Sequence, residues 1–153
     1  MIHLNVRALA ALSRLFLPDM VKRNSGRILN VSSTASMMPG PLQAVYFASK
    51  AFVTSLSYAL TEELRGTKVT VTALLPGATE TEFAKVSGMD KTDLFKKTFS
   101  ARSVAEDGYK AMMKGKMKAV AGVSFMQRMM FSFLPITPMG IKLSMVRKLQ
   151  ELK

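Results

Sequence analysis

Apolar residues recur near the helical period over residues 2–23, which predicts a helix there. The recurring positions are Leu4, Ala8, Leu12, Leu15 and Met20. Pro18 is expected either to kink this helix or to lie in its last turn. The short apolar run 27–32 predicts a buried strand, and a long amphipathic helix is expected over 43–65.

The second half of the chain continues this alternation. We expect a strand over 68–75, a helix over 103–114 and a strand over 118–123. Ser103 is predicted to cap the helix, with Glu106 three residues later completing a capping box. The polar stretch 78–101 predicts a loop that contains a short helix near 91–97.

An alternating order of helices and strands favours an α/β fold, with a parallel sheet covered by helices on both faces. About three strands are expected within residues 1–123. A sheet this narrow would leave an apolar edge bare, which indicates that something further covers it. Residues 124–153 form a separate hydrophobic and basic tail, predicted to be helical and broken by Pro135 and Pro138.

The amino-acid composition limits the kinds of chemical site that we expect in this chain. The 153 residues include no cysteine and one histidine, His3, so thiolate and histidine metal sites are not expected and we predict no metal. The formal net charge is +12. Because the charges are scattered and no basic run is interleaved with aromatic residues, we expect no nucleic-acid partner.

Ser33, Tyr46 and Lys50 are the candidate chemical groups. Ligands of open parallel sheets bind beyond the carboxyl ends of the strands, and Ser33 follows the first predicted strand. Tyr46 and Lys50 lie four residues apart and therefore share a helix face. A nearby ammonium lowers the pKa of a phenol, which can then exchange a proton with an alcohol or carbonyl oxygen. A serine hydroxyl can donate to the same oxygen.

The chain resembles the short-chain dehydrogenase/reductase family over about residues 2–123. The resemblance rests on Leu-Asn-Val-Arg-Ala around Asn5, Asn-Val-Ser-Ser ending at Ser33, Tyr-Phe-Ala-Ser-Lys from Tyr46 to Lys50, and Pro-Gly-Ala-Thr-Glu-Thr from Pro76. It implies a partial Rossmann-like, doubly wound sheet. It also implies an NAD(P)-dependent enzyme that interconverts an alcohol and a carbonyl.

Residue roles follow from the resemblance. Tyr46 would be the general acid/base, Lys50 would lower its pKa and bind the nicotinamide ribose, and Ser33 would polarise the substrate oxygen. Asn5 would hold a water that links Lys50 to solvent. The positions expected to contact the cofactor are Tyr46, Lys50, Pro76, Gly77, Thr79 and Thr81.

The sequence departs from the family pattern because it contains no Gly-x-x-x-Gly-x-Gly segment, whose helix would bind the pyrophosphate. The chain is therefore interpreted as a fragment, a truncated product or a short form that pairs with another chain, and by itself it should bind NAD(P) poorly. The net charge of +12 slightly favours NADP. The alternative function is a catalytically silent module for dimerisation or membrane association.

Partners follow from the same patterns. We expect a small carbonyl or alcohol substrate, hydrophobic in character if the tail shapes its entry. The resemblance implies a homo-oligomer formed through helices 2–23 and 43–65. For the tail, residues 124–153, three interpretations stay open: packing or dimerisation, contact with an anionic membrane surface, and binding of another partner. The expected location is cytoplasmic, either free or peripheral to a membrane.

Overall fold

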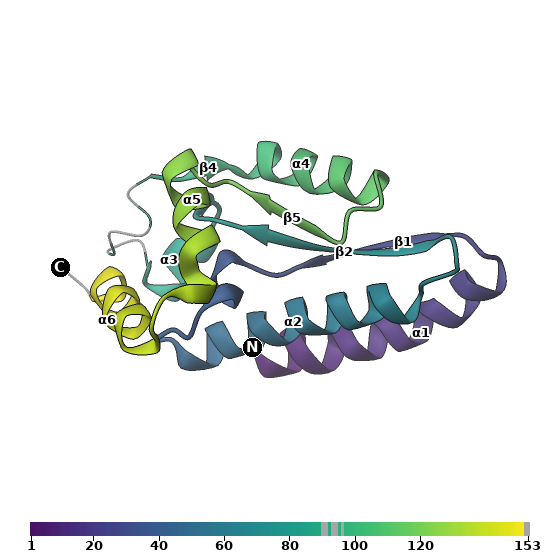
Figure 1. The fold of residues 1–153 in the computed structure, drawn as a ribbon, viewed down its shortest axis with the longest axis horizontal. Coiled ribbons are helices and arrows are strands. Elements are labelled where there is room, and N and C mark those ends of the chain that lie inside the picture. The colour runs from purple at the N-terminus through teal and green to yellow at the C-terminus, as the bar shows by residue number, and fades with distance from the viewer. Residues whose placement is uncertain (90–91, 93–94, 96, 152–153) are drawn as a thin grey trace.

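The computed structural model describes residues 1–89, 92, 95 and 97–151. Helices and strands alternate along most of it (Figure 1). In chain order the elements are η1 (His3–Ala8), α1 (Leu9–Lys22), β1 (Gly26–Val31), η2 (Thr34–Met37), α2 (Ala44–Glu63), β2 (Val69–Pro76), β3 (Thr79–Glu80), α3 (Phe83–Ser87), β4 (Phe99–Ser100), α4 (Ala101–Met113), β5 (Lys118–Ala121), α5 (Phe125–Phe133), η5 (Leu134–Ile136) and α6 (Met139–Gln150).

A three-stranded parallel sheet in the order β1-β2-β5 forms the centre of the molecule. Gly26 of β1 pairs with Val69, and Ala73 of β2 pairs with Lys118. Helices α1 and α2 cover one face and α4 covers the other, so the expected doubly wound α/β arrangement is confirmed (Figure 1). The two-residue strands β3 and β4 pair in a separate small sheet that the sequence pattern did not predict.

The core lies in two layers on either side of β2. Val71 packs with Leu64 and Val69 on the α2 face, whereas Leu74 packs with Val104 and Ala121 on the α4 face. Side chains along a strand alternate between its two faces, so a central strand covered on both sides must be apolar throughout. This requirement explains the buried run at the carboxyl half of β2.

The structure bears on three sequence-based expectations about local structure: the effect of Pro18 on the first helix, the residue that caps α4, and a helix near 91–97. Helix α1 continues through Pro18 to Lys22. Helix α4 begins at Ala101, and Ser100 is its cap, because the Ser100 hydroxyl accepts a hydrogen bond from the Ser103 backbone N–H at 3.2 Å. The prediction that Ser103 caps this helix was therefore wrong. The helix expected near 91–97 falls largely outside the described residues.

Candidate active site

The candidate site lies where β1 and β2 end. Strand β1 ends at Val31 and leads directly into Ser32 and Ser33, while β2 ends at Pro76. Since Val31 pairs with Leu74 in a parallel register, both chains leave the sheet at the same edge. Helix α2 begins near this edge, so its first turns carry Tyr46 and Lys50 to the residues that follow β1. This is the edge at which open parallel sheets bind ligands.

The Ser33 side chain lies near the Tyr46 phenol and lowers its pKa. The Ser33 backbone is extended and its hydroxyl accepts a hydrogen bond from the Ala35 N–H at 3.1 Å, which caps η2. Burial raises the pKa of the Tyr46 phenol, and the Ser33 side chain partly offsets this increase. The phenol is consequently protonated at neutral pH and is suited to donate a proton.

The Lys50 side chain points back toward the strand. Its Nζ donates a hydrogen bond of 3.1 Å to the Val31 carbonyl, and burial lowers the pKa of the ammonium. Lys50 is not among the groups that shift the pKa of Tyr46, whose pKa is raised by burial. An ammonium has three donors, so two remain for other acceptors at this site.

Asn5 joins the first helix to the turn that carries the other site residues. Its Nδ2 donates to the Ser49 hydroxyl at 3.0 Å, and that hydroxyl donates to the Tyr46 carbonyl at 2.8 Å. Asn5 lies in η1, a π-helical segment, and such segments occur frequently at functional sites. The structure therefore places Asn5, Ser33, Tyr46 and Lys50 in one region.

A second set of hydroxyl groups supports this region, and the sequence analysis did not identify it. The Ser32 hydroxyl donates to the Lys50 carbonyl at 2.8 Å and lies 2.7 Å from the Thr54 hydroxyl. Thr54 in turn donates to Ser36 at 2.9 Å. These contacts tie the loop after β1 to the second and third turns of α2. The only signal in the sequence was the helical spacing of Thr54 from Lys50.

Aromatic side chains enclose Tyr46. Its ring centroid lies 5.4 Å from that of Phe83 in α3 and 5.9 Å from that of Phe47. Phe83 lies 6.4 Å from Phe95. These rings account for the burial that raises the pKa of Tyr46, and they give the site an apolar wall. No pattern in the sequence marked Phe83 as part of the site.

The residues after β2 form one side of the same edge. The Gly77 N–H donates to the Ala121 carbonyl at 2.9 Å, and the Thr79 hydroxyl donates to the Gly77 carbonyl at 3.0 Å. Thr81 is exposed, and its hydroxyl accepts a hydrogen bond from the Phe83 N–H at 3.3 Å. The Thr81 hydroxyl hydrogen remains available for a ligand.

An apolar groove of about 330 Å³ lies away from Tyr46, along η1, α1 and β1. Leu12, Phe16, Ile28 and Val31 are among its lining residues, and Asn5 also lines it. Among the described residues no strand pairs with β1 on its outer side. The groove therefore follows the bare sheet edge that the three-stranded pattern predicted. Within the described residues, no three His, Cys, Asp or Glu side chains are grouped as metal ligands.

A titration can test the environment of Tyr46. Its phenol pKa is expected to lie above the ordinary value of about 10, because burial disfavours the phenolate. Ser33→Ala should raise that pKa further, since it removes the hydroxyl that lowers it. The measurement is the ultraviolet difference titration of tyrosinate, with Tyr46→Phe subtracted to isolate this residue. A lower pKa in Ser33→Ala would contradict this effect of Ser33.

The chain is similar to proteins of known family. The family model described as short chain dehydrogenase matches residues 1–92. The very-long-chain 3-oxoacyl-CoA reductase of Rattus norvegicus is 43% identical over 86 residues, an alignment that covers 56% of this chain and 28% of that protein. The chain thus spans less than a third of the length of this curated relative.

Solved structures with the same fold extend over more of the chain. A short-chain dehydrogenase from Sphingobium yanoikuyae in complex with NADPH has a TM-score of 0.72 and 27% identity, covering 84% of this chain and 50% of that one. A closed form of serine dehydrogenase complexed with NADP+ has a TM-score of 0.70 and 31% identity, covering 81% of this chain and 58% of that one. The sequence and fold comparisons agree.

Proposed function

Because the chain belongs to the short chain dehydrogenase family, we propose that it supplies the acid–base site of an NAD(P)-dependent oxidoreductase interconverting an alcohol and a carbonyl. The observation that carries the proposal is the placement of Ser33, directly after β1, and of Tyr46, in the first turn of α2, at the same edge of the sheet, where Ser33 opposes the rise in the pKa of Tyr46. The Lys50 ammonium is held to Val31 at the same strand end. Two neutral donors directed at one point suit an oxygen on which negative charge develops.

In the reducing direction, Tyr46 donates a proton to the carbonyl oxygen of the substrate. Its raised pKa keeps the phenol protonated at neutral pH, so the proton is available when the substrate binds. Ser33 donates a hydrogen bond to the same oxygen and orients the carbonyl. The carbonyl carbon would accept a hydride, which is the chemistry that a reduced nicotinamide cofactor would supply when bound. In the oxidising direction the phenolate would remove the alcohol proton, which favours alkaline pH.

The chemistry of the donor set fits the nicotinamide end of the cofactor. Lys50 retains two ammonium donors for ribose hydroxyls, while Thr79 and Thr81 provide polar groups beside the wall formed by Pro76 and Gly77. The glycine-rich segment that binds pyrophosphate is not among these 153 residues. We favour NADP over NAD, because the net charge of +12 suits an additional phosphate and because related structures contain NADPH or NADP+.

The substrate is proposed to have an apolar body beside its carbonyl. Phe83 and Phe47 lie against Tyr46, so a group attached to the reacting carbon would contact aromatic rings. Burial of such a group contributes binding without a polar partner. The rat relative is named a 3-oxoacyl-CoA reductase, and an acyl chain has this character. A ketone with an apolar chain is therefore the first substrate class to assay.

Ser33→Ala tests the reaction. Turnover should fall roughly 100-fold, because one donor to the reacting oxygen is lost. The measurement is NADPH consumption with ketone substrates, in a polypeptide that joins these residues to a glycine-rich cofactor-binding segment placed ahead of Met1. Ser55→Ala is the matched control, since Ser55 is an exposed serine on α2 outside the site. Equal rates in both variants would contradict the role of Ser33.

A second candidate function is association without catalysis. Helices α1 and α2 lie side by side on one face of the sheet (Figure 1), and Leu15 and Val45 on them are exposed by 66% and 54%. These helices are the proposed interface with a second copy of the chain. A protein can both associate and catalyse a reaction, so association alone does not distinguish the two functions, and turnover must be measured. A protein that dimerises but shows no Tyr46-dependent reduction would be a binding module.

A further inference from the structure

The described part of the tail, residues 124–151, carries apolar stripes that the rest of the described molecule does not cover. On α5 the stripe consists of Phe125, Met129 and Phe133, exposed by 79%, 48% and 57%. Their spacing of four residues places them on one helix face. On α6 the same spacing gives Ile141, Met145 and Leu149, exposed by 54%, 39% and 38%. These six residues are called the tail surface below.

The packing of the tail does not account for this surface. Among the described residues, neither α5 nor α6 packs extensively on the three-stranded sheet. Within the tail, Leu134, Val146 and Gln150 are buried, whereas the six residues of the tail surface are at least partly open to solvent. Monomeric proteins rarely expose a large contiguous apolar patch unless it has a partner.

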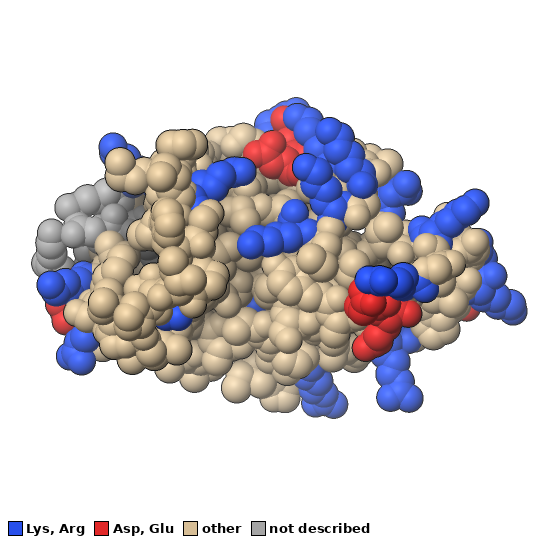
Figure 2. Space-filling view, in the orientation of Figure 1, with Lys and Arg blue, Asp and Glu red and all other residues tan. Residues whose placement is uncertain are grey.

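The charge of the tail indicates which kind of partner the tail surface binds. Residues 124–151 contain four cationic side chains, Arg128, Lys142, Arg147 and Lys148, and one acidic side chain, Glu151, which pairs with Arg147 at 3.2 Å. In Figure 2 the part of the molecule occupied by α5 and α6 is mostly uncharged, with cationic side chains at its margins. Apolar stripes bordered by cations match the interface of an anionic bilayer, where acyl chains lie beneath phosphate groups.

We propose that the tail surface docks the protein on an anionic phospholipid bilayer. The stripes of α5 and α6 would enter the boundary between headgroups and acyl chains, while Lys142 and Lys148 contact lipid phosphates. In this arrangement α5 and α6 lie along the surface of the bilayer. No described helix has the length and apolar character to cross one. A second copy of the chain suits this surface less well, because an isologous contact would bring like charges together.

Docking in this way has a consequence for the candidate active site. Helices α5 and α6 lie at the same end of the molecule as α3 and the beginning of α2, which carries Tyr46 (Figure 1). A docked protein would therefore present this end to the lipid. This consequence depends on the proposed function, whereas binding to the bilayer does not.

Vesicle co-sedimentation of the full chain tests the proposal. The vesicles contain roughly three parts phosphatidylcholine to one part phosphatidylglycerol, and pure phosphatidylcholine is the neutral comparison. The wild-type chain should sediment with the anionic vesicles and bind the neutral ones more weakly. Phe125→Ser/Phe133→Ser, and separately Lys142→Gln/Lys148→Gln, should each lower the partition coefficient by about tenfold or more.

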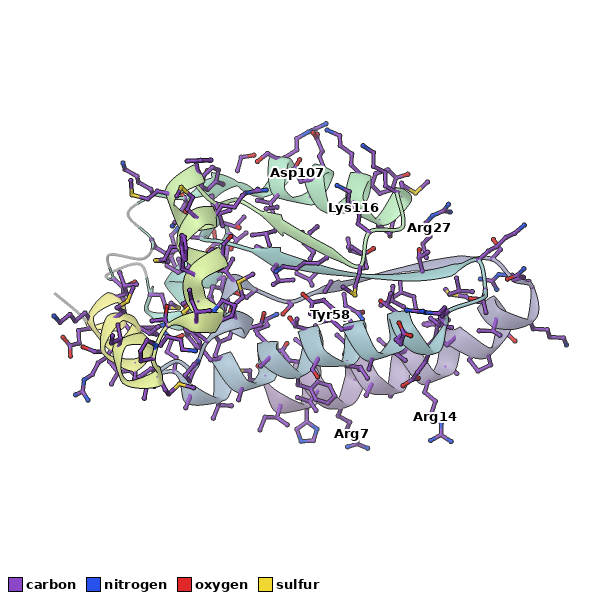
Figure 3. The ribbon with its side chains drawn as sticks, in the orientation of Figure 1. Arg7, Arg14, Arg27, Tyr58, Asp107 and Lys116 are labelled. Carbon is purple, nitrogen blue, oxygen red and sulfur yellow. The ribbon has the colours of Figure 1, made fainter. Side chains whose placement is uncertain are left out.

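The matched control variants carry the same kinds of substitution outside the tail. Tyr109→Ser/Met113→Ser removes two comparably exposed apolar side chains, also four residues apart, from α4. Arg7→Gln/Arg14→Gln removes two cations that point away from the first helix (Figure 3). Both controls should bind like the wild type, and circular dichroism should show the same helix content in every variant.

Three results would overturn the proposal. The first is a wild-type chain that stays in the supernatant with anionic vesicles. The second is binding that the tail variants retain and the control variants lose. The third is size-exclusion elution that shifts from dimer to monomer in Phe125→Ser/Phe133→Ser without any vesicle binding by the wild type, since that would identify a second copy as the occupant.

Discussion

Replacing Tyr46 with phenylalanine is expected to lower turnover by about three orders of magnitude while leaving cofactor affinity nearly unchanged. The phenol is the proposed proton donor, and positioned acid–base groups contribute roughly 10²- to 10⁴-fold to rate. The ring itself, which contacts Phe83 and Phe47, is retained in the variant. The measurement is kcat for ketone reduction by NADPH in a polypeptide that includes the cofactor-binding segment, together with the Kd for NADPH.

Tyr58→Phe provides the matched control. Tyr58 also lies on α2, and burial likewise raises the pKa of its phenol. Tyr58, labelled in Figure 3, lies twelve residues beyond Tyr46 on the same helix, or about three turns. The same loss of a hydroxyl should leave kcat within about twofold, because no transition-state interaction is removed. Turnover that survives Tyr46→Phe would exclude Tyr46 as the acid, whereas a wild-type polypeptide without any turnover would leave association without catalysis as the better hypothesis.

Gly77→Ala is expected to destabilise the fold by about 3 kcal/mol, near the upper end of ordinary overpacking. A Cβ atom at this position would lie 2.1 Å from the Gly122 carbonyl oxygen and 2.8 Å from Val123 Cγ1. The nearest atom belongs to the backbone, so no side-chain rotation can relieve the contact. Relief requires the ends of β2 and β5 to separate, which breaks the hydrogen bond from the Gly77 N–H to the Ala121 carbonyl.

The free energy of unfolding measured with urea checks this expectation. Gly140→Ala is the control, because nothing lies within 4 Å of a Cβ atom at Gly140. Gly140 lies inside α6, where alanine is favoured over glycine by up to about 1 kcal/mol. The two variants should therefore shift the urea midpoint in opposite directions. A Gly77→Ala protein with an unchanged midpoint would mean that the two strand ends are not closely packed.

The Lys50 side chain is placed differently from what its spacing from Tyr46 in the sequence predicts. One helical turn separates it from Tyr46, and a nearby ammonium would lower the pKa of the phenol. In the structure its Nζ is bound to the Val31 carbonyl, and burial dominates the pKa of Tyr46. Helical spacing places two side chains on one face, but the hydrogen-bond acceptors around them determine where a long flexible side chain points.

The order of helices and strands was determined by local patterns. The apolar run of β2 and the helical periods around α1, α2 and α4 depend on neighbouring residues, so the α/β alternation and the parallel sheet followed from the chain alone. The residue that caps α4 was harder to predict from the sequence, because Ser100 and Ser103 are both serines and lie three residues apart. Only the backbone path from β4 into α4 selected Ser100.

The sequence by itself determined which groups could perform proton transfer, since Ser33, Tyr46 and Lys50 are recognised by residue type and spacing. Only the tertiary structure decided what surrounds them: Ser49 as the link from Asn5, Thr54 behind the loop, and Phe83 against the Tyr46 ring. The physical reason is separation along the chain. Residues 22 to 44 positions apart meet through the packing of helices on a sheet, which no local period encodes, and that packing sets the burial that raises the pKa of Tyr46.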